Sequence, residues 1–394
     1  MKITKLETFM VGAGIRNWLF LKLHTDCGIV GVGEASMEWR ENAIETLLHE
    51  FLEELYVIGA NPFDIESLYM RVYRDGYWGG PVMMTALSGI EMACWDIIGK
   101  ALGQPVYNLL GGRCRNEIKA YANGWYGGER TPENYARQAK KVVAMKYKAL
   151  KFDPFGTAWK EMNHKEKMRA ISLVEAVRDA VGDEVEILIE VHGRLSVASA
   201  VEMAHELEKF KPAWYEEPVD PQNLESLAEV KNKTNLRIAA GERLYIPQDF
   251  FRLISLHAAD VIQLDVAHCG GILAAKKITA MVSAQDLLIA PHNSVGPVST
   301  AAALHLDTCT TNFMVQESYD DFDVPWRSDI VNGWKPIPSP PSAGGSEGGG
   351  KFTVPEGSGL GVELNDDAMA EHPPIKNPFP SLWEDEWIRN FTQR

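Results

Sequence analysis

Cysteine is scarce in this chain, and its spacing points to no metal or disulfide chemistry. The 394 residues include five cysteines, with no CxxC motif among them: Cys27, Cys94, Cys114, Cys269 and Cys309. An odd, scattered set is typical neither of a disulfide framework nor of a zinc site. We therefore expect reduced thiols in a cytoplasmic protein.

Targeting and membrane signals are also missing. Residues 1–7 resemble a first strand with interspersed charges, without the apolar core of a signal peptide. No uncharged apolar run approaches the roughly 18 residues that a membrane span requires. The net charge of −15 excludes nucleic acid and anionic membrane as main partners. A small anionic substrate remains compatible, because a bound metal and a few cationic side chains can dominate the local field.

The chain is long enough for one large domain and a smaller one. Residues 1–36 predict a strand meander, and helical periodicity follows over 42–56 and 83–102. Strands followed by helices indicate an N-terminal α+β capping domain over residues 1–118.

From residue 119 the pattern changes to alternating strands and helices, which predicts an α/β fold with a modified TIM-type (β/α) barrel over residues 119–325. The predicted strands are 119–125, 149–153, 186–192, 213–218, 237–242, 261–265, 287–292 and 313–317. Helices are expected between them, for example over 198–210 and 272–283. Residues 326–394 form a C-terminal strap, in which 336–350 are rich in Pro, Ser and Gly. We expect its aromatic tail (Phe379, Trp383, Trp387) to pack back on the body.

Three carboxylates follow three consecutive predicted strands. Glu190, Glu216 and Glu242 are separated by 26 residues each, which leaves room for one strand, one helix and two loops. In a barrel of this type, the carboxyl ends of the strands meet at one face, where the chemistry occurs. Oxygen ligands in this number suit a hard divalent cation, and Mg²⁺ is the expected cofactor.

Acid–base candidates occupy the remaining strand ends. Asp265 and His292 end the sixth and seventh strands, and a carboxylate beside an imidazole makes a general base that works near neutral pH. His192 follows Glu190; it is either a second acid–base group or a side chain that hydrogen-bonds a neighbouring strand end. His268 is expected to be a loop residue.

Other charged side chains accompany these candidates. Lys151 and Asp153 share a face of the second strand because strand side chains alternate, and Glu317 ends the eighth. Glu217 either supports Glu216 or faces a neighbour.

Together these motifs resemble the enolase superfamily, in its mandelate racemase branch, and within it the D-galactonate dehydratase group of acid-sugar dehydratases. The resemblance covers nearly the whole chain. It is carried by residues 18–22, 80–81 and 93–97 of the cap and by 191–194, 216–218, 239–243, 290–292 and 316–317 of the barrel.

The resemblance implies specific roles. Glu190, Glu216 and Glu242 match the Mg²⁺ ligands. His292 matches the base that removes the proton α to the substrate carboxylate, and Asp265 matches its partner.

Further roles follow from the same matches. His192 matches the acid that protonates the leaving hydroxyl, Glu317 matches the group that stabilises the enolate, and Lys151 would contact the carboxylate or the intermediate. Arg16 and Arg194 are candidate substrate contacts. The expected partner is a small sugar acid, and a homo-oligomer of unspecified size is expected.

Two departures from the family pattern matter. Glu190 stands where the family usually has Asp, which could shift the metal. Lys151-Phe152-Asp153 replaces the Lys-x-Lys of racemases and cycloisomerases. Losing the second lysine favours a dehydratase with His292 as sole base, and Asp153 becomes a candidate contact to a substrate hydroxyl.

The hypothesis is a Mg²⁺-dependent dehydratase that converts an aldonate to a 2-keto-3-deoxy acid. The alternatives are a racemase, epimerase or cycloisomerase at the same site, and a non-catalytic barrel that binds a sugar acid. A zinc amidohydrolase is disfavoured because the first strand carries no His-x-His. The glycines of residues 357–361 resemble a dinucleotide loop without the βαβ unit that such a loop needs. Specificity is expected to depend on cap loops, with 14–18 and 75–80 as candidates.

Overall fold

The computed structural model describes residues 1–338 and 350–376. Its amino-terminal part is an antiparallel sheet of β1 (Ile3–Ala13), β2 (Arg16–Thr25) and β3 (Val30–Glu34) in that order. The helices that follow it in the chain are α1 (Glu41–Leu47), which continues as the π-helix η1 (Leu48–Val57), then α2 (Ile65–Asp75), α3 (Pro81–Leu102) and α4 (Val106–Leu109). The meander and the helices over 42–56 and 83–102 are confirmed. Helix α2 was not predicted, and its buried stripe holds only Ile65, Leu68 and Val72.

Helix α3 forms the centre of the capping domain. Pro81 opens it, where a missing N–H costs nothing, and Gly103 ends it in the left-handed conformation. Among the described residues it is the one helix long and apolar enough to cross a membrane, but 83% of its most apolar 18-residue window is buried inside the protein. Its hydrophobicity is that of a core helix.

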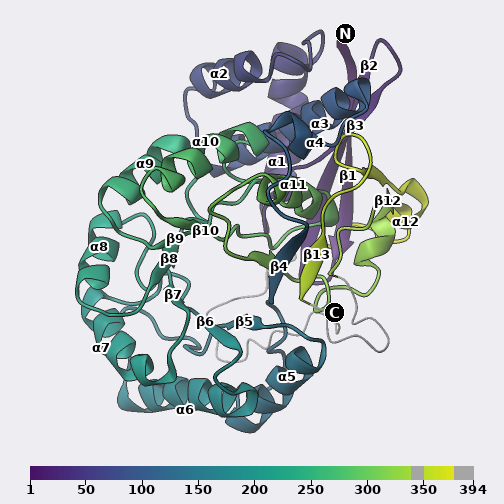
Figure 1. The fold of residues 1–394 in the computed structure, drawn as a ribbon. Helices are drawn as coiled ribbons and strands as arrows, with labels where there is room; N and C mark the ends of the chain where they lie inside the picture. Colours follow the sequence, from purple (N-terminus) through teal and green to yellow (C-terminus); the bar gives the residue numbers. More distant parts are fainter. Residues whose placement is uncertain (339–349, 377–394) are drawn as a thin grey trace.

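Eight parallel strands form the barrel, and Figure 1 shows the helices arranged around their outside. The strands are β4 (Glu117–Ala122), β5 (Ala149–Phe152), β6 (Glu186–Glu190), β7 (Trp214–Glu216), β8 (Ile238–Ala240), β9 (Val261–Ile262), β10 (Leu288–Ile289) and β11 (Gln316–Ser318). The hydrogen-bonded order is β10-β9-β8-β7-β6-β5-β4-β11. An isolated parallel bridge between Ile289 and Phe313 joins the two ends and closes the ring.

The barrel helices follow the strands in the expected alternation. They are α5 (Pro132–Ala144), α6 (His164–Val181), α7 (Val197–Leu207) with the 3₁₀ turn η2 (Glu208–Phe210), α8 (Leu224–Asn232), α9 (Pro247–Ser255), α10 (Ile272–Ser283) and α11 (Pro297–Thr308). The strands are shorter than predicted, because the last residues of most predicted strands leave the ladder and turn into the loops that carry the site. A buried cluster with one residue from each strand region fills the interior: Tyr121, Ala149, Leu188, Trp214, Ala239, Val261, Ala290 and Val315.

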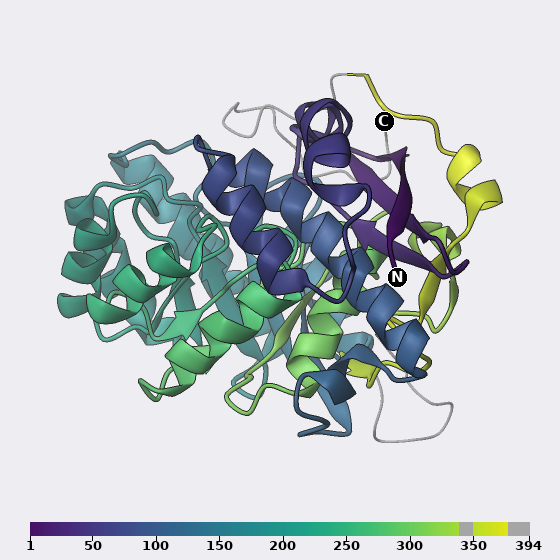
Figure 2. The same cartoon turned by 90° about the horizontal axis from the view of Figure 1, so that it is seen from above.

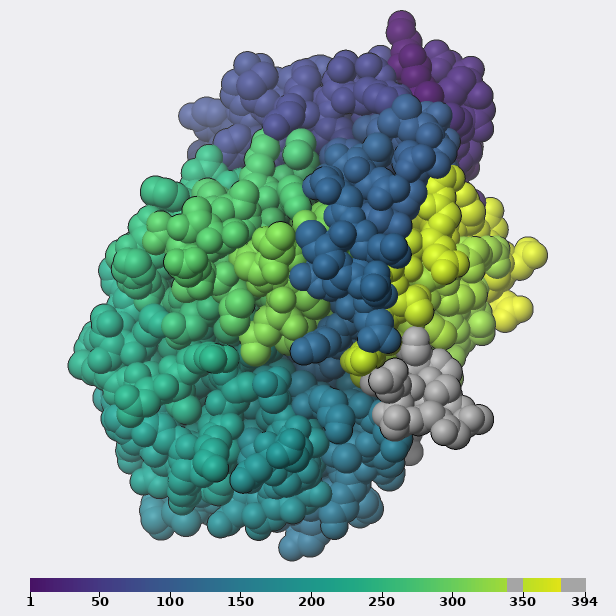
Figure 3. All heavy atoms as spheres, in the orientation of Figure 1, coloured from purple at the N-terminus to yellow at the C-terminus, as the bar shows by residue number. Residues whose placement is uncertain are grey.

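The C-terminal segment runs back along both domains. The 3₁₀ turn η3 (Arg327–Ile330) leads into β12 (Val331–Gly333), which pairs with β14 (Val362–Leu364); β13 (Lys351–Thr353) pairs with β4, and α12 (Asp366–Ala370) follows. Gly12 N donates to His372 O, which ties the end of the segment to β1. Figure 3 shows this yellow segment beside the blue and purple capping domain. The aromatic tail at 379–387 lies outside the described residues.

The glycine-rich loop at 357–361 serves this packing. Leu360 N donates to the Asp96 carboxylate of α3 over 2.8 Å, and a Cβ on Gly359 would meet the same carboxylate at 2.1 Å. The loop therefore needs glycine for close approach to α3, and the dinucleotide interpretation is excluded.

Two buried carboxylates of the capping domain dock it on the barrel. Glu34 of β3 accepts hydrogen bonds from Gly296 N and Ser299 N at the start of α11. Glu91 of α3 accepts them from Ile272 N and Leu273 N at the start of α10. Acidic side chains are favourable at helix amino termini, where backbone N–H groups lack partners. Figure 2 shows the blue helix α3 lying across the green barrel helices, which include α10, the helix that Glu91 caps.

Candidate active site and metal centre

A cavity of about 300 Å³ lies between the capping domain and the barrel strand ends. The cap contributes Ile15, Arg16, Met37, Glu38 and Trp39 to its wall. The barrel contributes Asn123, Lys151, Asp153, His192, Arg194, Glu242, Arg243, Tyr245, His268, His292, Ser294 and Tyr319. Residues that follow seven of the eight barrel strands therefore face one space, and β7 is the exception.

Glu190, Glu216 and Glu242 lie together at the ends of three adjacent strands. One carboxylate oxygen from each lies within 4.8 Å of the others. Glu190 and Glu216 are buried, 1% and 0% exposed, and Glu242 reaches the cavity. Burial and the neighbouring Glu216 raise the pKa of Glu190 above its ordinary value. Three close oxygen donors that repel one another fit a divalent cation, and the longer Glu190 still reaches the group.

Lys151 provides positive charge beside these carboxylates. Its ammonium lies 2.6 Å from Glu216 Oε1, 3.1 Å from Glu317 Oε1 and 3.3 Å from Glu190 Oε2. Burial disfavours the charged form, but the surrounding carboxylates outweigh it and raise the pKa of Lys151 well above its ordinary value. It is therefore a permanent cation at the cavity wall.

Glu317 is fully buried and is not among the residues that line the cavity. It accepts hydrogen bonds from Asn123 Nδ2 (2.7 Å) and Asn293 N (2.9 Å) besides its ion pair with Lys151. Burial would raise its pKa, yet Lys151, His292 and these donors lower it to about 2. An ionised carboxylate in this position orients Lys151 and Asn123. Its role in stabilising the enolate, which the resemblance implies, stays a prediction.

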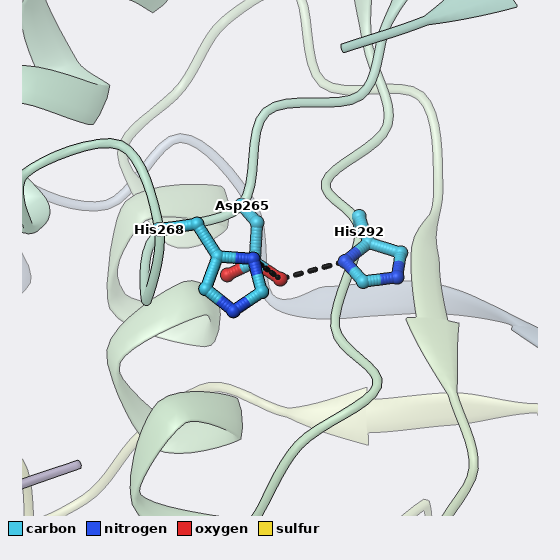
Figure 4. A group of neighbouring side chains, drawn as sticks. All are labelled: Asp265, His268 and His292. Atoms are coloured by element: carbon cyan, nitrogen blue, oxygen red, sulfur yellow. Dashed lines mark hydrogen bonds and ion pairs between the residues drawn. The ribbon is translucent and has the colours of Figure 1, made fainter. Parts of the chain in front are cut away.

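The Asp265 carboxylate interacts with two imidazoles, those of His292 and His268, as Figure 4 shows. His292 Nδ1 lies 2.6 Å from Asp265 Oδ2, and His268 Nδ1 lies 3.4 Å from the same oxygen. The backbone N–H of Ala267 donates to Oδ1 and fixes the carboxylate. Burial lowers the pKa of His292, but Glu242, Glu317 and Asp265 outweigh burial and raise it well above the ordinary value. His292 Nε2 lies 3.5 Å from Glu242 Oε2, beside the metal candidates.

A second His–Asp pair lies at the ends of β5 and β6. His192 Nδ1 lies 2.8 Å from Asp153 Oδ2, and Arg194 donates to the same oxygen. Burial raises the pKa of Asp153, but Arg194 and His192 outweigh burial and lower it below the ordinary value. Asp153 and Arg194 border the cavity, yet Asp153 accepts from protein donors and Arg194 donates to Asp153 and to backbone carbonyls. Direct substrate binding by these two residues stays a prediction.

Part of the cavity wall that the capping domain forms was not predicted. Met37, Glu38 and Trp39, just beyond β3, line the cavity, and Glu38 accepts a hydrogen bond from Ser294. The residues that line the cavity include none from 75–80, where Tyr77 and Trp78 are 81% and 85% exposed. That predicted loop does not line this cavity. Residues 37–39 follow Glu34, whose carboxylate accepts hydrogen bonds from backbone N–H groups at the start of α11. These hydrogen bonds join segments that lie more than 250 residues apart in the chain.

The other predicted cap loop reaches the site. Arg16 lines the cavity, is 3% exposed and pairs with Asp323 over 2.8 Å. Glu217, adjacent to Glu216, pairs with Arg243, whose Nε lies 2.8 Å from Glu217 Oε2. Glu217 therefore faces a neighbouring strand end, which was one of its two expected positions.

The strand order places acid–base groups on opposite sides of the cavity. In the eight-strand ring, β6 and β10 are separated by three strands in either direction. His192 follows β6 and His292 follows β10, and both line the cavity. A molecule held there would have an imidazole on each side and the carboxylate group between them.

Two family models match the chain and cover most of it. Residues 134–368 match the enolase C-terminal domain-like model, which identifies the barrel as a member of the enolase class. Residues 7–111 match the N-terminal domain of mandelate racemase / muconate lactonizing enzyme. The chain belongs to the mandelate racemase / muconate lactonizing enzyme family of the enolase superfamily.

Its relatives include sugar-acid dehydratases. The chain is 38% identical over 319 residues to the D-gluconate/D-galactonate dehydratase of Picrophilus torridus. The matched region covers 80% of this chain and 81% of the relative. It is 39% identical over 318 residues to the D-galactonate dehydratase of Pectobacterium atrosepticum, and the matched region covers 80% of this chain and 81% of that relative. Among solved structures, the mandelate racemase/muconate lactonizing enzyme from Jannaschia sp. CCS1 is 32% identical with a TM-score of 0.86, covering 95% of this chain and 98% of that one.

Proposed function

We propose that this protein is a Mg²⁺-dependent dehydratase of an aldonate, which removes the proton α to the carboxylate and eliminates the β-hydroxyl to give a 2-keto-3-deoxy acid. The observation that carries the proposal is the carboxylate group with one His–Asp pair on each side of it. Family relatives named as gluconate and galactonate dehydratases support the substrate class.

The chain's own residues divide the reaction between them. His292 takes the α-proton at Nε2, because Asp265 holds the other ring nitrogen and fixes the tautomer. Lys151 places a cation where negative charge develops on the substrate carboxylate. His192, from the opposite side, donates a proton to the hydroxyl that leaves the neighbouring carbon. The C–O bond electrons depart with that oxygen as water, and the enol product tautomerises to the keto acid.

Glu190, Glu216 and Glu242 are the residues that would hold the cation, since they offer three close carboxylate oxygens at the barrel mouth. A bound divalent cation would neutralise the substrate carboxylate and so acidify the α-proton. Arg16 and Glu38, on the cap side of the cavity, are positioned to contact the rest of the sugar chain.

The experiment is a screen of aldonates with Mg²⁺ that reads formation of an α-keto acid. D-Gluconate and D-galactonate differ at C4, away from the reacting carbons, and turnover of one or both is expected. D-Mannonate, the C2 epimer of gluconate, turns its α-proton toward the opposite side of the cavity. It should react at least about 100-fold less efficiently, as expected when a general base cannot reach its proton.

The outcomes separate this function from its rivals. Exchange of the α-proton with solvent deuterium without loss of water, across the whole panel, would replace the dehydratase with a racemase or epimerase. Binding of an aldonate with neither exchange nor product would indicate a non-catalytic sugar-acid binder.

A further inference from the structure

The backbone at His192 adopts an unusual conformation that is supported on several sides. His192 has φ of +55°, and Gly193 follows with φ of +69°. His192 N donates to Glu190 Oε1 over 2.7 Å, and Gly193 N donates to Glu217 O over 2.7 Å. A left-handed non-glycine residue costs on the order of 1 kcal/mol or more and persists where its surroundings hold it. The turn places the His192 ring at the cavity wall.

The Asp153 carboxylate accepts hydrogen bonds from three protein donors, which together occupy both of its oxygens. Oδ1 accepts from Phe155 N over 2.9 Å, while Oδ2 is shared by His192 Nδ1 and Arg194. Arg194 is in turn anchored through Nε to Val191 O over 2.7 Å. Asp153 is 1% exposed, whereas the His192 side chain is 27% exposed. The carboxylate is therefore a fixed support, and the imidazole is the group that a ligand can touch.

We infer that Asp153 is a positioning residue: its carboxylate holds the His192 ring through Nδ1, so that Nε2 of His192 faces the leaving hydroxyl. The inference rests on the proposed dehydration and adds a second His–Asp unit to it. His292 with Asp265 and His192 with Asp153 then form matched pairs on opposite sides of the barrel mouth. Proton removal at C2 and departure of the C3 hydroxyl take place on opposite faces, which is an anti elimination.

The geometry distinguishes this role from a direct hydrogen bond between Asp153 and a substrate hydroxyl. Such a bond would require a further lone pair of Asp153 directed into the cavity, but this carboxylate is 1% exposed and already accepts three hydrogen bonds, whereas the His192 side chain is 27% exposed. A mutation that removes a hydrogen bond to bound substrate would raise KM, whereas a misplaced His192 lowers kcat.

The test compares dehydration with α-proton exchange in Asp153→Asn. In D₂O with Mg²⁺ and the aldonate that the wild type turns over, kcat for keto-acid formation should fall about 100-fold or more, the usual contribution of a placed acid. KM should change less than about threefold, and exchange of the α-proton should persist because His292 is intact. Asp153→Asn/His192→Asn should be no slower than His192→Asn alone, because the two residues act as one unit.

Two variants serve as controls. Asp265→Asn should lose exchange and dehydration together, since it disturbs the base. Asp96→Asn removes an equally buried carboxylate of α3, far from the chemistry, and should leave the ratio of dehydration to exchange unchanged. A raised KM with wild-type kcat in Asp153→Asn would overturn the inference, and so would loss of exchange along with dehydration in a variant that melts like the wild type.

A substrate-free readout keeps this test separate from the proposed function. A His192 Nδ1 proton bonded to a carboxylate should give a low-field NMR resonance that disappears in both His192→Asn and Asp153→Asn and persists in Asp265→Asn. Its persistence in Asp153→Asn would overturn the pairing. A wild type that shows the resonance but dehydrates no aldonate would refute the proposed function and leave the pairing intact.

Discussion

At the scale of single residues, Asp265 is shared between two imidazoles. His268 lies 3.4 Å from Asp265 Oδ2, and its Nε2 lies 3.2 Å from Ser36 O in the capping domain. His268 thus links the partner of the base to the cap. Its place in the site could not be read from the sequence, because a histidine three residues after a strand-end aspartate is usually a loop residue.

Replacing His268 should slow catalysis without abolishing it. In His268→Gln, Asp265 still contacts His292 but loses the second imidazole that restrains it. We therefore expect kcat to fall about 10-fold, which is the smaller of the effects usually seen when a residue that supports a functional side chain is replaced. Steady-state kinetics with the preferred aldonate measure this. His257→Gln, in a surface turn after α9, is the matched control, and equal kinetics in both variants would deny His268 a role.

Prediction from sequence worked best for side chains that follow a buried strand. Glu190 and Glu216 end β6 and β7, and Lys151 lies within β5, so the strand pattern alone brings them together. It failed for pairings between loops. Nothing in Lys151-Phe152-Asp153 reveals that the His192 turn brings an imidazole onto the Asp153 carboxylate.

At the scale of elements, the cap is held by carboxylates at helix amino termini. Glu91 of α3 accepts hydrogen bonds from backbone N–H groups at the start of α10, and Glu34 of β3 accepts them at the start of α11. Helices α3 and α10 were predictable from periodicity. Their docking was not, because it depends on hydrogen bonds between residues about 180 or more positions apart in the chain. The loop at residues 37–39 reaches the cavity through this docking.

Removing the α10 cap should destabilise the protein. Glu91→Ala leaves the N–H groups of Ile272 and Leu273 without an acceptor in a buried place, which costs about 1–3 kcal/mol of unfolding free energy. Urea unfolding measures the loss. Glu66→Ala breaks an exposed cap–barrel ion pair with Lys277 and should cost less than about 1 kcal/mol. A larger loss in the exposed variant would contradict this account of docking.

At the scale of the whole molecule, buried His305 makes stability depend on pH. It lies in α11, accepts a hydrogen bond from Tyr107 N, and burial lowers its pKa to about 4. The folded state therefore favours the neutral ring. The stabilisation is complete above the unfolded pKa of about 6.5 and is lost as the pH falls toward 4.

The comparison of His305→Gln with the wild type isolates this effect. Between pH 6.5 and 4.5 the wild type should lose on the order of 2 kcal/mol more unfolding free energy than the variant. Exposed His205→Gln should keep the wild-type slope. Parallel pH curves for wild type and His305→Gln would show that the buried ring titrates normally.

Metal binding should be visible in stability as well as in activity. Three close carboxylates repel one another without a cation, so Mg²⁺ at 100 times its Kd should raise the unfolding free energy by about 2.7 kcal/mol. The shift should disappear in Glu242→Gln, and chelation should abolish turnover. Thermal unfolding with and without Mg²⁺ gives the measurement, and an equal shift in Glu242→Gln would place the ion elsewhere.

The central claim is that His292 is the base for dehydration of an aldonate. Wild type and His292→Asn are incubated with Mg²⁺ and D-gluconate or D-galactonate in D₂O, and substrate and product are followed by NMR. We predict a 2-keto-3-deoxy acid from the wild type, and neither product nor α-deuterium incorporation from His292→Asn. Keto-acid formation by His292→Asn at the wild-type rate, or exchange without product in the wild type, would contradict the account.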